Sequence, residues 1–237
     1  MSDAVLLPVY NEAATVGAVL DAVRGYFHGD ILVVDDGSTD ATVRVLAERR
    51  DISVITHPYN MGYGRALAEG FSVARARGCH RVVTMDCDGQ HEPAHIPAFL
   101  AVLNEGWDIV SGSRYLPGSS EVGMVAPGDR RQVNERVTAE INRVTGWRLT
   151  DSFCGFKAYR LEALEGIELT EPGYAMPVEM WAKAHLAGLH VCERAVERIY
   201  CDHDRSFGED LDDPQHRFGY YMRVWRRALG TDPSGRR

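Results

Sequence analysis

The chain carries the stretch Val82-Val83-Thr84-Met85-Asp86-Cys87-Asp88-Gly89-Gln90, an apolar, β-prone run that ends in two carboxylates separated by one residue. Two unit charges about 4 Å apart repel by roughly 4 kcal/mol at an effective dielectric constant of about 20, and a divalent cation removes that penalty. Hard cations prefer carboxylate, amide and water oxygens. The stretch therefore predicts a metal site of Asp86, Asp88 and Gln90 at a strand end. A surface turn, in which Asp and Gly are common, is the alternative.

Strand-like runs alternate with helix-like segments on both sides of this stretch. The runs predict strands at residues 4–8, 31–34, 52–56, 81–85 and 107–111, with helices at 13–27, 40–50, 63–77 and 94–105. Such alternation predicts an α/β fold with a mostly parallel, Rossmann-like sheet flanked by helices. Ligands bind these sheets beyond the carboxyl ends of the strands, so the polar residues after the first, second and fourth strands are expected to share one edge.

The second half of the chain is less regular. Its patterns predict loops at residues 116–129 and 202–213, helices at 130–144, 178–186 and from 214 onward, and strands at 155–159 and 191–200. Neither a linker nor an internal repeat is visible, so a single domain over residues 1–237 is expected.

Composition narrows the function classes. A chain of 237 residues with 45% hydrophobic content can bury a full core, and a net charge of −8 argues against nonspecific binding to nucleic acid. Five cysteines without a Cys-x-x-Cys pair disfavour a disulfide framework or a zinc ribbon and fit a cytoplasmic protein. The sequence suggests neither a signal peptide nor a spanning helix, so any membrane contact is expected to be peripheral.

Two segments after the first two strands suggest a nucleoside site. A Gly-x-Gly-x-x-Gly loop does not follow the first strand, which disfavours a nicotinamide or flavin enzyme. Residues 8–12 (PVYNE) instead offer an aromatic face, and residues 35–40 (DDGSTD) offer carboxylates that accept from base N–H or ribose hydroxyl groups. Asp36 is expected to bind base or ribose, with helix capping as the alternative.

Five motifs stand in a fixed order along the chain: PVYNE at 8–12, VVDDGSTD at 33–40, NMGYGRA at 60–66, MDCDGQ at 85–90 and SGSRY at 111–115. Over about residues 3–200 the chain resembles the family-2 glycosyltransferases, in particular their dolichol- or polyprenol-phosphate mannose synthase branch. The resemblance implies a GT-A fold, a nucleoside-diphosphate sugar donor, and Mg²⁺ or Mn²⁺. It also divides the domain into a nucleotide-sugar half (about 1–115), an acceptor half (about 116–213) and a C-terminal amphipathic helix and tail (214–237).

The family pattern assigns roles to individual residues. Those expected to bind the nucleotide sugar are Pro8, Tyr10, Glu12, Val34, Asp36, Gly62, Arg65, Asp86, Cys87, Asp88, Gln90 and Arg114. The candidate catalytic residues are Asp88, Arg114, Arg131, Asp151, Glu179 and Arg205, with Arg130 as a further candidate beside Arg131. In an inverting transfer, the metal and the arginines would stabilise negative charge on the departing diphosphate more in the transition state than in the ground state.

The acceptor is the least determined part. The resemblance favours GDP-mannose as donor, with a UDP-sugar left open, and polyprenyl phosphate as acceptor, which needs no general base because it is already an anion. Residues 150–157 (TDSFCGFK) resemble that branch, whereas residues 205–213 carry one arginine and four acids where the branch has Arg-x-x-Gly-x-Ser-Lys. A soluble hydroxyl acceptor therefore stays open, with Asp151 or Glu179 as its base; capping and ion pairing are the alternative for both. A catalytically silent nucleotide-sugar-binding module also stays open.

An apolar stripe lies in the last predicted helix, at Phe218, Tyr221, Met222, Trp225 and Leu229, with arginines around it. A basic amphipathic helix is able to lie on a membrane surface. Packing of the stripe against the protein's own core is the favoured interpretation.

Overall fold

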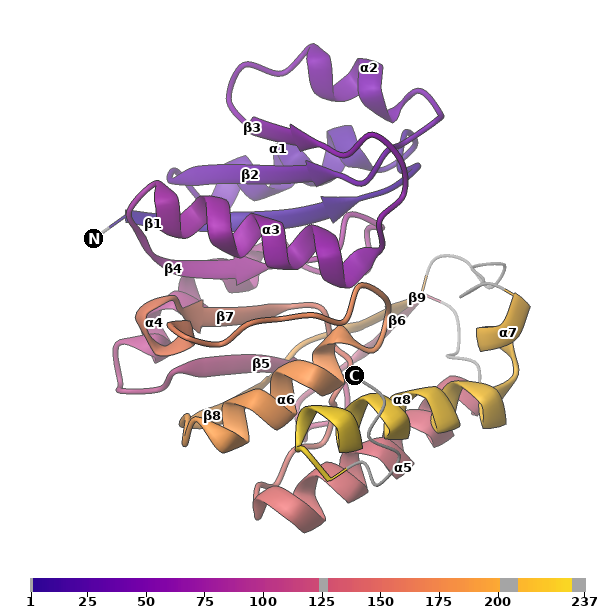
Figure 1. Ribbon diagram of the computed structural model, residues 1–237. Helices are drawn as coiled ribbons and strands as arrows, with labels where there is room; N and C mark the ends of the chain where they lie inside the picture. Colours follow the sequence, from indigo (N-terminus) through magenta and orange to yellow (C-terminus); the bar gives the residue numbers. More distant parts are fainter. Residues whose placement is uncertain (1, 124–127, 201–208, 232–237) are drawn as a thin grey trace.

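The computed structural model describes residues 2–123, 128–200 and 209–231. A seven-stranded sheet lies at its centre, in the order β3-β2-β1-β4-β7-β5-β8 (Figure 1). The strands are β1 (Ser2–Val9), β2 (Asp30–Asp35), β3 (Ser53–Thr56), β4 (Cys79–Thr84), β5 (Ile109–Ser113), β7 (Lys157–Arg160) and β8 (Val191–Ala195). Every neighbouring pair is parallel except the two pairs that include β7, so the prediction of a mostly parallel sheet in an α/β fold is confirmed.

Helices cover both faces of the sheet. They are α1 (Val16–Tyr26), α2 (Thr42–Ala47), α3 (Tyr63–Ala76), α4 (Ile96–Leu103), α5 (Gly128–Thr145), α6 (Met176–Leu186), α7 (Glu209–Asp212) and α8 (Pro214–Ala228), with short 3₁₀ helices at η1 (Pro93–His95) and η2 (Glu162–Leu164). One hydrophobic core joins the sheet to α3, α5, α6 and α8. The other joins it to α1 and α4. Because the strands are buried on both faces, their sequences are continuous apolar runs.

The antiparallel strand β7 explains why the second half of the chain reaches the predicted site. Parallel strands β1, β2, β4 and β5 all end at one edge of the sheet, and β7 begins at that edge, with Lys157 opposite Thr84 and Ser111. The segment before β7 therefore meets the residues that follow β4 and β5. The strand order also reverses direction between β1 and β4, the kind of position at which open α/β sheets bind ligands.

Three predictions for the second half are wrong in detail. Residues 121–123, within a predicted loop, form β6 (Glu121–Gly123), which pairs with β9 (Arg198–Tyr200) in a second sheet. The predicted strand over 191–200 is consequently divided between β8 in the main sheet and β9 in the small one. Of the predicted loop over 202–213, residues 209–212 form α7, and residues 202–208 lie outside the described residues. Elements of three or four residues are too short for side-chain periodicity to reveal them.

The apolar stripe of α8 packs inside the protein. Tyr221, Met222 and Trp225 are buried in the core shared with α5 and α6, and the Phe218 ring lies under the Arg136 guanidinium at 3.8 Å. The interpretation that this stripe packs on the protein's own core is therefore confirmed. Among the residues that the structure describes, none of the helices is long and apolar enough to cross a bilayer.

Candidate active site

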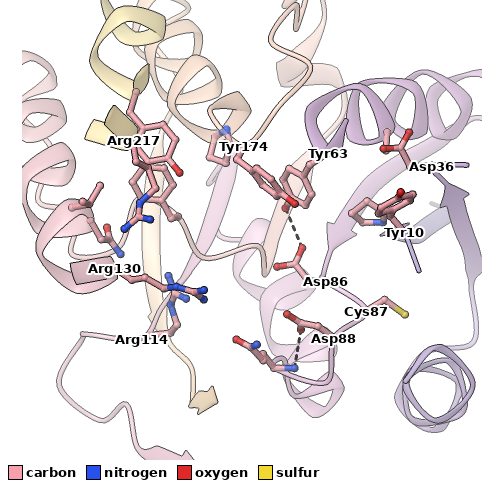
Figure 2. Close-up of a pocket in the computed structure, with 18 of the residues that line it drawn as sticks. Tyr10, Asp36, Tyr63, Asp86, Cys87, Asp88, Arg114, Arg130, Tyr174 and Arg217 are labelled. Atoms are coloured by element: carbon pink, nitrogen blue, oxygen red, sulfur yellow. Dashed lines mark hydrogen bonds between the residues drawn. The ribbon is translucent and has the colours of Figure 1, made fainter. Parts of the chain in front are cut away.

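A cavity of about 380 Å³ opens at the edge where the parallel strands end. Its walls come from both halves of the chain (Figure 2). The residues that line it are Pro8, Tyr10, Glu12, Asp36, Tyr63, Ala66, Asp86, Cys87, Asp88, Gln90, Arg114, Tyr115, Arg130, Val133, Asn134, Phe153, Tyr174, Pro177, Arg217 and Tyr221. Asp86 and Asp88 lie between a wall with Tyr10 and Asp36 and a wall of three arginines.

The Asp86 carboxylate is held closely on two sides. The Tyr63 hydroxyl donates a hydrogen bond to Asp86 Oδ1 at 3.1 Å. On the other side lies Gly155, where a Cβ atom would come within 2.3 to 2.7 Å of the carboxylate atoms. Burial raises the pKa of Asp86, and the hydrogen bond from Tyr63 and the charges of Lys157 and Arg114 act against that rise. Only glycine at position 155 leaves room for this carboxylate.

Asp88 and Gln90 belong to the turn that follows Asp86. The Gln90 backbone N–H donates to Asp88 Oδ1 at 2.9 Å, and both side chains line the cavity. Burial and then the nearby Asp86 charge raise the pKa of Asp88. Cys87 also lines the cavity but is 2% exposed, and burial raises the pKa of its thiol to about 12.

His91 fixes the backbone of this turn. Its Nδ1 accepts a hydrogen bond from the Asp86 backbone N–H at 2.9 Å. Burial lowers the pKa of His91 to about 4, so the ring is neutral near pH 7 and carries its proton on Nε2. His91 is therefore an uncharged support for the acidic turn.

The acidic turn fits a hard divalent cation. Two half-buried carboxylates and an amide side chain form an oxygen donor set of the kind that Mg²⁺ and Mn²⁺ prefer. Burial raises the pKa of both acids, and the nearby Asp86 charge raises that of Asp88 further. The described residues (2–123, 128–200 and 209–231) contain no group of three or more His, Cys, Asp or Glu side chains that could hold a metal ion by themselves. An ion at Asp86 and Asp88 would thus need further oxygens from water or from a bound ligand.

The opposite wall carries the predicted nucleoside residues. Tyr10 is 43% exposed and presents its ring to the cavity. The Asp36 carboxylate accepts from the backbone N–H groups of Met61 and Gly62, each at 2.8 Å, and lies 2.6 Å from His57 Nδ1. Asp36 therefore holds the start of α3 and also lines the cavity. Its position is compatible with both hypotheses, helix capping and contact with a bound base or ribose.

Three of the predicted nucleotide-sugar residues do not line the cavity. The Val34 side chain is buried in the core beneath α3. Gly62 allows close packing, since its Cβ would lie 2.3 Å from the Pro172 carbonyl oxygen. The Arg65 side chain is exposed, while its backbone N–H donates to Pro172. The glycine-rich motif at 60–66 thus serves helix packing at these positions.

The arginine wall is built around a buried ion pair. Arg114 Nε and Nη2 donate to the two oxygens of Asp151, at 2.7 and 3.0 Å. Asp151 also accepts from Asn134 Nδ2 and from the Phe153 backbone N–H, and it is fully buried. Burial opposes its charge, but the charge and hydrogen bonds of Arg114 outweigh burial and hold the pKa of Asp151 at about 2. Asp151 is therefore an ionised partner that orients Arg114.

Two further arginines reach this wall from the starts of two helices. Arg130 lies in the first turn of α5 and Arg217 in the first turn of α8. Arg217 is 3% exposed, and it donates to Asp129 Oδ2 at 2.7 Å and to the Leu211 carbonyl oxygen at 2.8 Å. Arg217 was not among the predicted site residues, because in the sequence it is one basic residue among several in an amphipathic helix.

Four predicted catalytic residues lie outside the cavity lining or the described residues: Asp151, which is buried behind Arg114, and Arg131, Glu179 and Arg205. Arg131 forms an exposed ion pair with Glu135 at 2.8 Å. Glu179 is 2% exposed; it accepts from the backbone N–H and hydroxyl of Thr170 and pairs with Lys183 at 2.8 Å. This is the ion-pairing alternative for Glu179. Arg205 lies outside the described residues.

Comparisons with known proteins agree with this geometry. The model of the family described as "Glycosyl transferase family 2" matches residues 4–167. The chain is 32% identical over 216 residues to the undecaprenyl-phosphate mannosyltransferase of Micrococcus luteus, covering 86% of this chain and 84% of the relative. It is 31% identical over 201 residues to the polyprenol monophosphomannose synthase of Mycolicibacterium smegmatis, covering 80% and 74%.

A solved structure shares the whole fold. Glucosyl-3-phosphoglycerate synthase from Mycobacterium tuberculosis, crystallised with Mn²⁺, UDP and glucosyl-3-phosphoglycerate, superimposes with a TM-score of 0.72 at 21% identity, covering 99% of this chain and 82% of that one. The expectation of a GT-A fold is confirmed.

Proposed function

Since the chain belongs to glycosyltransferase family 2 and is a glycosyltransferase, we propose that it transfers a hexose from a nucleoside-diphosphate sugar to polyprenyl phosphate in a metal-dependent, inverting reaction. One observation carries the proposal: a single cavity has two half-buried carboxylates, Asp86 and Asp88, on its floor and three arginines along one wall. That arrangement suits a cation, a diphosphate and a second phosphate in one place.

The arginine wall is the argument for an anionic acceptor. The N-terminus of a helix carries a partial positive charge, which adds to the charge of an arginine in its first turn and favours binding of an anion. Arg130 and Arg217 both stand in such first turns and line the cavity. The third arginine of this wall is Arg114. Asp151 holds Arg114 and Asp129 holds Arg217, so protein carboxylates orient these two side chains at the wall. A phosphate between the arginines would stabilise all of these charges.

The carboxylates argue against a hydroxyl acceptor. A hydroxyl nucleophile needs a general base within hydrogen-bond reach, whereas a phosphate monoester does not. Of the two predicted bases, Asp151 is committed to Arg114 and its pKa is about 2, and Glu179 lies outside the cavity. Neither is placed to remove a proton from a bound alcohol.

The reaction would proceed by direct displacement. A phosphate oxygen of the acceptor, held by Arg130 and Arg217, would form a bond to C1 of the hexose as the bond from C1 to the diphosphate oxygen breaks, inverting the configuration at C1. The nucleoside diphosphate would leave with the electron pair. A divalent ion bound by Asp86, Asp88 and Gln90 would supply charge stabilisation to the leaving diphosphate. Tyr10 and Asp36 would hold the nucleoside.

The names of the relatives favour mannose, and hence GDP-mannose, as donor, with a UDP-sugar as the alternative. The ligands of the glucosyl-3-phosphoglycerate synthase structure favour a second candidate, a small phosphate-bearing acid as acceptor with a UDP-sugar as donor. Both acceptors carry a phosphate that the arginine wall would recognise. The second would accept the sugar on its hydroxyl, for which neither Asp151 nor Glu179 is placed as base, so polyprenyl phosphate is favoured.

One transfer assay separates these candidates. The protein is incubated with Mn²⁺ and labelled GDP-mannose or UDP-glucose, together with polyprenyl phosphate, polyprenol or 3-phosphoglycerate. Label that enters the organic phase with polyprenyl phosphate alone is the expected result. A labelled water-soluble product with 3-phosphoglycerate would support the second candidate, and label on polyprenol would contradict both. Metal-dependent donor binding without nucleoside diphosphate release from any acceptor would indicate a silent binding module.

A further inference from the structure

Tyr63 is a cavity residue for which the family pattern gives no role. It lies in the motif at 60–66, and its hydroxyl donates to Asp86 Oδ1 at 3.1 Å (Figure 2). Gly155 bounds the same carboxylate on the other side, with room for no Cβ atom. The Asp86 carboxylate is therefore confined by the Tyr63 hydrogen bond, by the Gly155 backbone and by His91, whose Nε2 lies 3.8 Å from Oδ2.

Tyr63 itself is anchored at the first residue of α3. The two backbone N–H groups before it, those of Met61 and Gly62, donate to Asp36. The two after it, those of Gly64 and Arg65, donate to the Pro172 carbonyl oxygen at 2.7 and 3.1 Å. Protein acceptors thus satisfy the start of α3, so this helix end is a fixed platform for the tyrosine.

The ring of Tyr63 is fixed as well as its backbone. It stacks on the Tyr174 ring, with the ring centroids 6.0 Å apart and the planes inclined by 24°. Tyr174 lines the cavity from the segment that also supplies Pro172. The hydroxyl consequently has little freedom to leave Asp86.

We propose that Tyr63 is a positioning residue for the cation site: it fixes the Asp86 carboxylate in the orientation that a divalent ion requires. This inference rests on the metal dependence in the proposed function. The hydroxyl engages Oδ1 from the side of α3, while Gly155 and His91 Nε2 lie beside Oδ2, so the carboxylate is held in one orientation. Residues that hydrogen-bond to metal-ligating carboxylates orient them, and their loss commonly weakens metal binding about 10- to 100-fold. Because Asp36 and Tyr63 are fixed by the same helix start, α3 links the nucleoside wall to the cation site.

The test is the Tyr63→Phe variant, which removes the hydroxyl and keeps the ring that stacks on Tyr174. Tyr220→Phe is the matched control, because the Tyr220 hydroxyl also donates to a carboxylate, that of Glu171, away from Asp86. The first readout is the Mn²⁺ dissociation constant in the presence of excess UDP or GDP, measured by electron paramagnetic resonance of free Mn²⁺. The second is kcat at saturating Mn²⁺, and the third is the unfolding temperature without metal.

We expect Tyr63→Phe to weaken Mn²⁺ binding about 10-fold or more, with kcat at saturating Mn²⁺ largely retained and Tyr220→Phe unchanged in Mn²⁺ affinity. Equal Mn²⁺ affinity of Tyr63→Phe and wild type would overturn the inference and leave the proposed function standing. If the wild type binds no Mn²⁺ with either nucleotide, the metal-dependent function and the inference both fall. A lower unfolding temperature with unchanged Mn²⁺ affinity would reduce Tyr63 to a structural role and overturn the inference.

Discussion

Substitution of Gly155 by alanine is the sharpest perturbation of the acidic turn, because it adds one methyl group against the Asp86 carboxylate. The added Cβ would lie 2.3 Å from Asp86 Oδ2, where ordinary contacts begin at 3.4 Å, so the carboxylate must retreat by about 1 Å. The backbone offers little relief, since the Gly155 carbonyl oxygen accepts from Thr84 Oγ1 at 2.8 Å. Overpacking of this kind costs about 1–3 kcal/mol of unfolding free energy.

The functional cost should exceed the structural one. A reacting group misplaced by about 1 Å commonly loses about 100-fold in rate, so we expect kcat/KM of Gly155→Ala to fall by about that factor, with a raised Mn²⁺ requirement. The assay is transfer of labelled hexose across a Mn²⁺ titration, beside urea unfolding. Gly25→Ala in α1 is the matched control, because its Cβ would meet nothing within 4 Å. Wild-type turnover and Mn²⁺ dependence in folded Gly155→Ala would refute the placement of Asp86.

Substitutions of Asp151, Glu179 and Arg130 test the ion pairs and the arginine wall. Burial opposes the charge on Asp151, but the charge and hydrogen bonds of Arg114 outweigh burial, so the pKa of Asp151 falls from 3.8 to about 2. This shift contributes about 2 kcal/mol to the free energy of unfolding above a pH of about 4, and the contribution is lost as the pH falls toward 2. Asp151→Asn should remove that acid dependence in urea titrations and lower stability by about 3 kcal/mol at pH 7, because the partly buried Arg114 loses its charged partner; an unchanged acid profile would contradict the assignment. Glu179→Gln should cost about 1–3 kcal/mol in urea unfolding, because its bonds to Thr170 and Lys183 weaken, whereas loss of turnover in a fully stable variant would restore a catalytic role. Arg130→Met should raise the KM for polyprenyl phosphate about 10-fold or more with nucleotide affinity unchanged, and an unaltered acceptor KM would remove Arg130 from the acceptor site.

The first half of the fold was predictable because its elements are long and repeat with one pattern. Strands buried on both faces are continuous apolar runs, and each ends abruptly in polar residues that share one edge of the sheet. Tyr10, Asp36, Asp86 and Asp88 follow those strands directly, so their gathering in one cavity could be inferred from topology alone.

The rest depends on tertiary packing that a single sequence does not reveal. Arg217 and Tyr174 reach the cavity only because α8 and the segment before α6 fold back over the sheet edge. Glu179 matches a family acid in sequence, yet its carboxylate turns to Thr170 and Lys183. The small sheet of β6 and β9 joins residues 121–123 to 198–200, and neither strand has the length to be recognised by itself.

The central claim is that a divalent ion held at Asp86 and Asp88 stabilises the bound diphosphate of the nucleotide. Calorimetric titration of UDP and GDP into the protein, with Mn²⁺ and with a chelator, tests it directly when wild type and Asp88→Ala are compared. We predict that one nucleotide binds the wild type at least about 10-fold more tightly with Mn²⁺, and that Asp88→Ala stays folded but loses this difference. Equal nucleotide affinity with Mn²⁺ and with chelator in the wild type, or an unaltered metal effect in Asp88→Ala, would contradict it.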